Sequence, residues 1–107
     1  MKAYAVAFVR KVEPNAEIVE YLQRIDATLD PFGGRFVVHG GGAECFEGDA
    51  VMDAIVIEFP DRGRLRAWWD SPEYQEILPL RTRNMVADIV FVDGVPAGYR
   101  GADALAH

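Results

Sequence analysis

The chain has 107 residues, of which 50% are hydrophobic and 26% are charged, and this composition indicates one ordered globular domain rather than a disordered segment. Its formal net charge is −6 at pH 7, and its only lysines are Lys2 and Lys11. Because the chain has no basic stripe to neutralise phosphates, we exclude nucleic acid and anionic membrane surfaces as partners.

The first half of the chain predicts a strand, a helix and a second strand. Residues 3–12 alternate with a period of two and carry apolar side chains on both sides, which is typical of a strand covered on both faces. A helix over about residues 15–29 follows, because apolar residues recur there at helical spacing. These residues are Ile18, Leu22, Ile25 and Leu29. An Asp-Pro step and two glycines then end the helix, and residues 35–41 form the second strand.

The second half predicts a strand, two short helices, a last strand and a tail. The segment AIVIEF at 54–59 is rich in β-branched residues, as strands are. Asp61 is a suitable N-cap for the helix after it. The expected inward face of that helix carries Leu65, Trp68 and Trp69. Ser71, followed by proline, is a second cap that begins a second helix. Residues 87–94 predict the fourth strand, and 95–107 a weakly structured tail.

The order of these elements, βαββαβ, predicts the fold. Such a chain usually forms a four-stranded antiparallel sheet with its helices on one face, the ferredoxin-like arrangement of the α+β class. We expect a single domain over residues 1–94, followed by the tail. The other face of the sheet has no helix to cover it, yet several strands are apolar on both sides. We therefore expect a homodimer, in which a second copy covers that face.

Several segments, taken together and in this order, resemble a known family. They are ATLDPFGGRFVVHGG at 27–41, the Glu-Gly turn at 47–48, VIEFPD at 56–61, AWWDSPEYQEILPLRTR at 67–83 and VDG at 92–94. The chain resembles the domain-of-unknown-function 1330 family over about residues 3–94. The resemblance implies a ferredoxin-like protomer that dimerises into an α+β barrel, and it implies no activity. Wider relatives of this architecture include cofactor-independent monooxygenases and muconolactone-type isomerases, which is an analogy of fold alone.

Most reaction classes are excluded by the residues present. His39 and the three glycines after it match the HGGG oxyanion loop of esterases, but Ser71 is the only serine and it fits a helix cap. Nothing in the sequence brings Cys45 within hydrogen-bond reach of His39, as a nucleophile and its base require. His39 and His107 are far apart and no ligand pair has helical or hairpin spacing, so we expect no metal.

The motifs, apolar runs and cysteine pairs that the sequence lacks bear on cofactors and on localisation. Phosphate-cradling loops and dinucleotide fingerprints are missing, so we expect no cofactor. No uninterrupted apolar run approaches the roughly 18 residues of a membrane helix. Cys45 stands alone, which excludes an internal disulfide and fits a reducing compartment. We expect a cytoplasmic protein.

Ionisable residues interrupt the apolar strands and are the first candidates for a site. They are Arg10, His39, Glu58 and Asp88. Where such groups are buried they must be paired or neutralised, which favours a small polar network in a mostly apolar cavity. The alternative is a purely structural set of ion pairs at strand ends or at a dimer interface.

The stretch WWDSPEYQEILPLRTR at 68–83 supplies the second group of candidates. Its capping residues explain most of the pattern, and Trp68 and Tyr74 are more often core than ligand platform. Trp69, Arg81 and Arg83 remain as candidate ligand-binding residues, because a guanidinium group is well suited to hold a carboxylate. An internal salt bridge is the competing interpretation of the arginines.

Two functional hypotheses follow. In the first, the dimer binds a small organic metabolite, such as an organic acid, between sheet and helices. His39 then donates or accepts a proton, Glu58 orients it or acts as a base, and Arg83 anchors an anionic group. Proton transfer or cofactor-free oxygenation would suit such a site. In the second, the chain is a non-catalytic dimerisation or assembly module with no small-molecule site.

Overall fold

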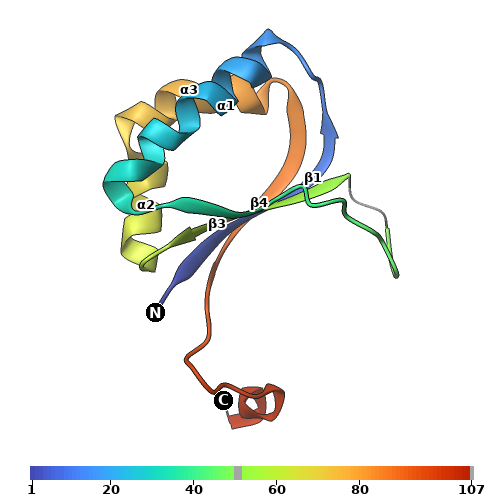
Figure 1. Cartoon of the computed structure of the whole chain (residues 1–107), viewed down its shortest axis with the longest axis vertical. Helices are drawn as coiled ribbons and strands as arrows, with labels where there is room; N and C mark the ends of the chain where they lie inside the picture. The colour runs from blue at the N-terminus through green and yellow to red at the C-terminus, as the bar shows by residue number, and fades with distance from the viewer. Residues whose placement is uncertain (50–51, 107) are drawn as a thin grey trace.

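The computed structural model describes residues 1–49 and 52–106, and it confirms the predicted βαββαβ order (Figure 1). The elements are β1 (Ala3–Val12), α1 (Ala16–Leu29), the 3-10 helix η1 (Asp30–Phe32), β2 (Arg35–His39), β3 (Asp53–Phe59), α2 (Arg62–Asp70), α3 (Pro72–Thr82), β4 (Met85–Asp93) and the 3-10 helix η2 (Gly101–Ala106). The four strands pair antiparallel in the order β2-β3-β1-β4. All three α-helices lie on one side of this sheet, and Figure 1 shows no helix covering the other side. The predicted ferredoxin-like α+β fold is therefore confirmed.

The alternation along β1 divides the sheet into two different faces. Ala3, Ala5 and Val9 are buried under the helices. The residues between them point to the uncovered side, where Phe8 remains 41% exposed. We call this uncovered side the open face, and the side under the helices the inner face.

Helix α1 packs on the inner face through a stripe that includes three of its four predicted residues, Ile18, Ile25 and Leu29. The buried residues are Ile18, Tyr21, Ile25, Thr28 and Leu29. Leu22, which the helical spacing places in the core, is 45% exposed. The spacing of 18, 21, 25 and 28 also fits one helical face, and the helix is rotated so that Tyr21 faces inward. The prediction of Leu22 as a core residue is wrong for that reason.

The double-tryptophan stretch forms the centre of the core, at the junction of α2 and α3. The rings of Trp68 and Tyr74 lie 4.1 Å apart between centroids, and the Trp68 indole N–H donates to the Thr28 hydroxyl at 3.0 Å. Ser71 ends one helix and begins the next. Its Oγ donates to the Trp68 carbonyl at 2.7 Å and accepts from the Tyr74 amide at 3.3 Å. The predicted cap and the predicted core roles of Trp68 and Tyr74 are confirmed.

Three boundaries differ from the sequence expectation. Strand β2 ends at His39, because the three glycines after it adopt left-handed φ angles of 84°, 65° and 63° that no longer fit a β ladder. Strand β4 begins at Met85, two residues before the predicted start. The tail is not without structure, since Gly101–Ala106 form a 3-10 helix.

The predicted role of Asp61 as the N-cap of α2 can be tested by substitution. The Asp61 carboxylate accepts a hydrogen bond from the Arg64 amide at 2.7 Å. Replacing Asp61 by alanine leaves that amide without its partner, and we expect a loss of about 1 kcal/mol in the free energy of unfolding. Asp61→Asn keeps a capping oxygen, and its free energy of unfolding should fall by only a few tenths of that amount. Urea denaturation measures both variants. Equal losses in the two variants would contradict the capping role.

Candidate functional site

A cavity of about 240 Å³ lies between the inner face of the sheet and helices α1 and α3. Its walls are mostly apolar and come from all four strands and all three helices. The polar groups that line it are Tyr21, His39, Asp53, Tyr74 and Arg81. Such a hollow, apolar with a few convergent polar groups, is the usual form of a small-molecule site.

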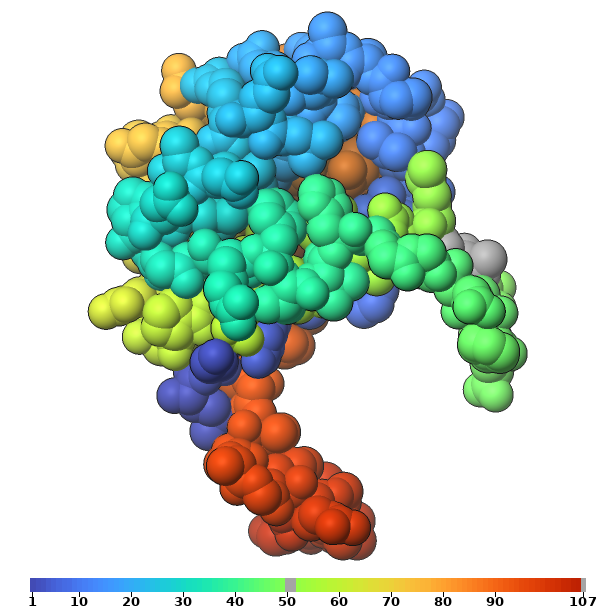
Figure 2. Space-filling model, in the orientation of Figure 1, coloured from blue at the N-terminus to red at the C-terminus, as the bar shows by residue number. Residues whose placement is uncertain are grey.

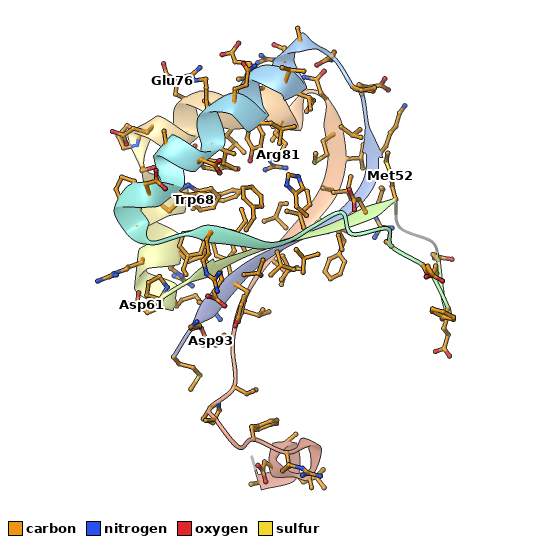
Figure 3. The ribbon with its side chains drawn as sticks, viewed as in Figure 1. Met52, Asp61, Trp68, Glu76, Arg81 and Asp93 are labelled. Atoms are coloured by element: carbon orange, nitrogen blue, oxygen red, sulfur yellow. The ribbon has the colours of Figure 1, made fainter. Side chains whose placement is uncertain are left out.

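Arg81 is the unusual member of this lining. Arg81 shares one face of α3 with Tyr74 and Ile77, because positions 74, 77 and 81 follow helical spacing. Its side chain is only 8% exposed. Figure 3 shows its side chain directed into the space between the helices and the sheet. The proline at position 79 does not end α3, which runs on to Thr82 and so keeps Arg81 in the inward-facing row.

The charge of Arg81 has no partner inside the described part of the chain. None of the ion pairs among residues 1–49 and 52–106 involves it. No fully buried side-chain nitrogen or oxygen of these residues lacks a hydrogen-bond partner, so unbonded nitrogens of Arg81 must be accessible. The accessible space beside this buried residue is the cavity. A guanidinium group in apolar surroundings is stable only when an anion or hydrogen-bond acceptors face it.

Two tyrosines stand beside Arg81. The hydroxyls of Tyr21 and Tyr74 are 2.8 Å apart, and their rings meet edge to face. Burial raises the pKa of Tyr21, the Tyr74 hydroxyl raises it further, and Arg81 partly opposes both. The phenol of Tyr21 therefore stays protonated and can donate a hydrogen bond at this end of the cavity. Tyr21 was not among the predicted site residues, although its spacing from Ile18 and Ile25 places it on the same helical face.

His39 lies on the same side of the sheet as the cavity, as its hypothesised role requires. It is paired with Ile55 of β3 and its ring stacks on Phe36, 4.8 Å away between centroids. His39 is exposed, so this end of the cavity is in contact with solvent. Asp53 also lines the cavity, and its Oδ1 accepts from the Ala54 amide at 3.0 Å. Asp53 was missed, yet its place two residues before Ile55 puts it on the inner face.

Glu58 lies on the opposite face of the sheet, and the predicted partnership with His39 does not form. In the strand register Glu58 pairs with Arg35, whereas His39 pairs with Ile55, three positions away. Side chains three positions apart on a strand point to opposite faces. Glu58 accepts from Lys2 at 3.1 Å and lies 3.0 Å from Arg35, and these two cations, Lys2 first, lower its pKa. The prediction that Glu58 orients His39 is therefore wrong, and the structural ion-pair interpretation describes Glu58.

Arg83 is also engaged elsewhere. Its guanidinium donates to the Glu17 carboxylate, which raises the pKa of Arg83 and lowers the pKa of Glu17. Asn84 adds a hydrogen bond of 2.9 Å to the same carboxylate. This cluster joins the start of α1 to the end of α3 at the surface. The hypothesis that Arg83 anchors a ligand is not supported by this geometry, and Arg81 is the arginine that faces the cavity.

Trp69 lines the cavity from α2. It is half-buried and its ring lies 5.4 Å from Tyr74 and 5.5 Å from Phe91, between centroids. Of the predicted ligand-binding residues, Trp69 and Arg81 therefore share one cavity, and His39 joins them.

Other chemistries find little support in the described residues. Within residues 1–49 and 52–106 there is no group of three histidine, cysteine or carboxylate side chains that could hold a metal ion. His107 lies outside the described residues. Cys45 is exposed in the β2–β3 loop and does not line the cavity. No described helix is long and apolar enough to cross a membrane.

Residues 2–95 match the family model described as Domain of unknown function (DUF1330). The chain belongs to this family. No curated protein matches the chain. The family membership confirms the resemblance found in the sequence, and it assigns no activity.

Solved structures give the same fold at low sequence identity. A protein of unknown function from Rhodopseudomonas palustris is 15% identical, with a TM-score of 0.68 over 89% of this chain and 83% of that chain. A dimeric ferredoxin-like protein of unknown function from Thermobifida fusca is 16% identical, with a TM-score of 0.58 over 88% of this chain and 92% of that one. SnoaB, a cofactor-independent oxygenase from Streptomyces nogalater, is 13% identical, with a TM-score of 0.58 over 92% and 97% of the two chains. These similarities show the fold alone.

The Glu17–Arg83 pair predicts a pH dependence of stability. Because the pKa of folded Glu17 is below its ordinary 4.5, the stabilisation is present above that value and is lost as pH falls through the lowered pKa. We expect the stability difference between wild type and Glu17→Gln to be largest near neutral pH and to shrink below about pH 4. Urea denaturation across pH measures it. In an Arg83→Gln background the difference near neutral pH should be smaller, and a wild-type difference that did not vary with pH would contradict the pairing.

Proposed function

We propose that the chain forms a homodimer that binds a small organic acid in the cavity between sheet and helices. The observation that carries the proposal is a buried arginine, Arg81, which faces an apolar cavity and has no carboxylate partner among the described residues. A ligand carboxylate would supply the missing partner. The volume of about 240 Å³ is below the roughly 300–1,000 Å³ of pockets for drug-sized ligands, and so favours a small metabolite.

In this proposal the two ends of the ligand meet different parts of the cavity. The planar guanidinium of Arg81 offers paired N–H donors that match the two oxygens of a carboxylate. The phenol of Tyr21 adds a neutral donor nearby. The apolar body of the ligand packs against the walls, including Trp69 and Ile57. Burial of that body supplies affinity, and the arginine supplies orientation.

Proton transfer is the chemistry that we assign to the other end of the cavity. The imidazole of His39 can donate or accept a proton, and it is placed where it reaches both the cavity and solvent. It can therefore take a proton from a bound molecule and release it to water. Asp53, which lines the same end, replaces Glu58 as the acidic residue of this site. The description of SnoaB as a cofactor-independent oxygenase is compatible with a site built only from side chains.

The homodimer is proposed from the open face of the sheet. Exposed apolar side chains gather there, namely Phe8, Val38, Val86, Val90 and Val92. The charges on this face are paired within the chain, as in Arg10 with Asp88 at 2.7 Å. The carboxylates of Asp88 and Glu58 have counter-ions within the chain, so two open faces can meet without burying an unpaired carboxylate there. Similar structures are described as dimeric ferredoxin-like proteins.

Removal of the Arg81 charge tests the binding proposal. We expect Arg81→Gln to weaken binding of phenylacetate by at least about tenfold, because charge-assisted hydrogen bonds are lost. Arg83→Gln is the matched control and should bind within about twofold of wild type, since Arg83 is engaged with Glu17. Isothermal titration calorimetry measures both, with circular dichroism as the check on folding. Phenylacetamide, which lacks the charge, should bind wild type weakly. Equal affinity for the acid and the amide would overturn the role of Arg81.

The proton-transfer role is tested at His39. In D₂O we expect the protein to accelerate exchange of the hydrogens next to the keto group of phenylpyruvate, measured by proton NMR. His39→Gln should reduce the acceleration by about a hundredfold, a typical contribution of a general base, while leaving phenylpyruvate affinity within about threefold. Glu58→Gln is the control and should keep the acceleration. An equal rate in wild type and His39→Gln would remove His39 from the chemistry.

A further inference from the structure

The tail after β4 projects away from the rest of the protomer. Figures 1 and 2 show residues 95–106 leaving the body on the side of the sheet opposite the helices. The backbone and side-chain hydrogen bonds found in this segment join tail residues to one another, such as the Asp103 amide to the Arg100 carbonyl at 2.8 Å. The radius of gyration is 15.2 Å, against about 13 Å for a compact chain of this length. We call residues 95–106 the arm.

The arm has a defined conformation that its own contacts do not explain. It contains the six-residue 3-10 helix Gly101–Ala106, whereas such helices seldom exceed three or four residues without support. Short helices in water are also marginal on their own. Its apolar side chains are open to solvent within the protomer, with Leu105 86% exposed and Val95 62% exposed. Within the described part of the protomer these apolar side chains therefore remain largely exposed.

The path of the chain shows which side that surface lies on. Gly94 ends the last strand with its amide bonded to the Lys2 carbonyl at 2.8 Å. A Cβ at position 94 would lie 3.1 Å from the ring of Tyr4, which belongs to the open face. A Cβ at position 94 would therefore point to the open face, and the chain beyond it leaves the sheet on that side (Figure 1). The described part of the β2–β3 loop, residues 40–49, extends toward the same side at the other end of the molecule, and Figure 2 shows a wide gap between the two.

We propose that the arm clasps a second copy of this chain, packing Leu105 and Val95 against the partner's surface. This inference rests on the homodimer proposed above, because the arm leaves the sheet on the side that the second copy would cover. In a two-fold dimer each protomer gives one arm and receives one, so the contact is made twice. The overall charge of −6 opposes association, and the exchange of two apolar arms would offset that repulsion.

A charged substitution in the arm tests the inference. We expect Leu105→Asp to raise the dimer dissociation constant at least about tenfold by sedimentation velocity, because the lost contact occurs twice per dimer. The matched control is Val19→Asp, which places the same charge at an exposed valine on the outer side of α1, and which should change the constant by less than about threefold. If wild type is a dimer and Leu105→Asp leaves the dimer dissociation constant unchanged, the exchange of arms is contradicted but the homodimer is not. A wild type that stays monomeric would overturn both.

A second measurement does not depend on a substitution. A dimer made from one isotope-labelled and one unlabelled chain should give NMR cross-peaks from the Leu105 methyl groups to the unlabelled chain. Cross-peaks confined to the labelled chain would overturn the exchange of arms.

Discussion

The helices of this chain can cover only one face of its four-stranded sheet, and the other properties of the molecule follow from that constraint. The inner face is closed by α1, α2 and α3, with Trp68 and Tyr74 at the centre of the contact. The open face keeps apolar side chains such as Phe8 and Val90 in contact with solvent. A single protomer therefore contains one packed face and one face that remains unsatisfied. The cavity lies on the first face, and the proposed association uses the second.

The alternation of the strands keeps these two roles apart. Neighbouring residues of β3 serve different surfaces, because Ile57 faces the cavity while Glu58 forms ion pairs on the open face. A substitution on one face should therefore leave the other largely intact, although the positions are adjacent in the chain. The same separation explains why ionisable residues that look alike in the sequence have different surroundings. His39 reaches the cavity, whereas Asp88 pairs with Arg10 on the far side.

The sequence could predict the elements but only part of the site. Caps such as Asp61 and Ser71 act through bonds to residues three positions away, so local pattern was enough to find them. The rotation of α1 depends on how it packs on the sheet, and the apolar spacing of Leu22 fitted nearly as well as that of Tyr21. The register of β2 decides which face His39 shares, and that register includes an irregularity between Phe36 and Val38 that no local pattern reveals.

Arg81 and Arg83 show why the site residues were harder to predict from the sequence than the helices and strands. Arg81 and Arg83 are close in sequence, but two positions along a helix turn a side chain to the opposite side. The spacing of Arg81 from Tyr74 and Ile77 places it on the buried row, and this could have been read from the sequence once α3 was known to continue past its internal proline. The proline removes a backbone donor without ending the helix here.

The position of Arg81 also links the proposed function to stability. An apolar side chain of similar length at position 81 would fill the inner face without the desolvation of a guanidinium group, and such replacements of buried charges are often neutral or stabilising. The empty protomer therefore carries a cost that a bound carboxylate would remove. Ligand binding should then stabilise the fold, since the ligand supplies the counter-charge only to the folded chain. A site that is costly when empty and favourable when filled is a common consequence of selection for binding over stability.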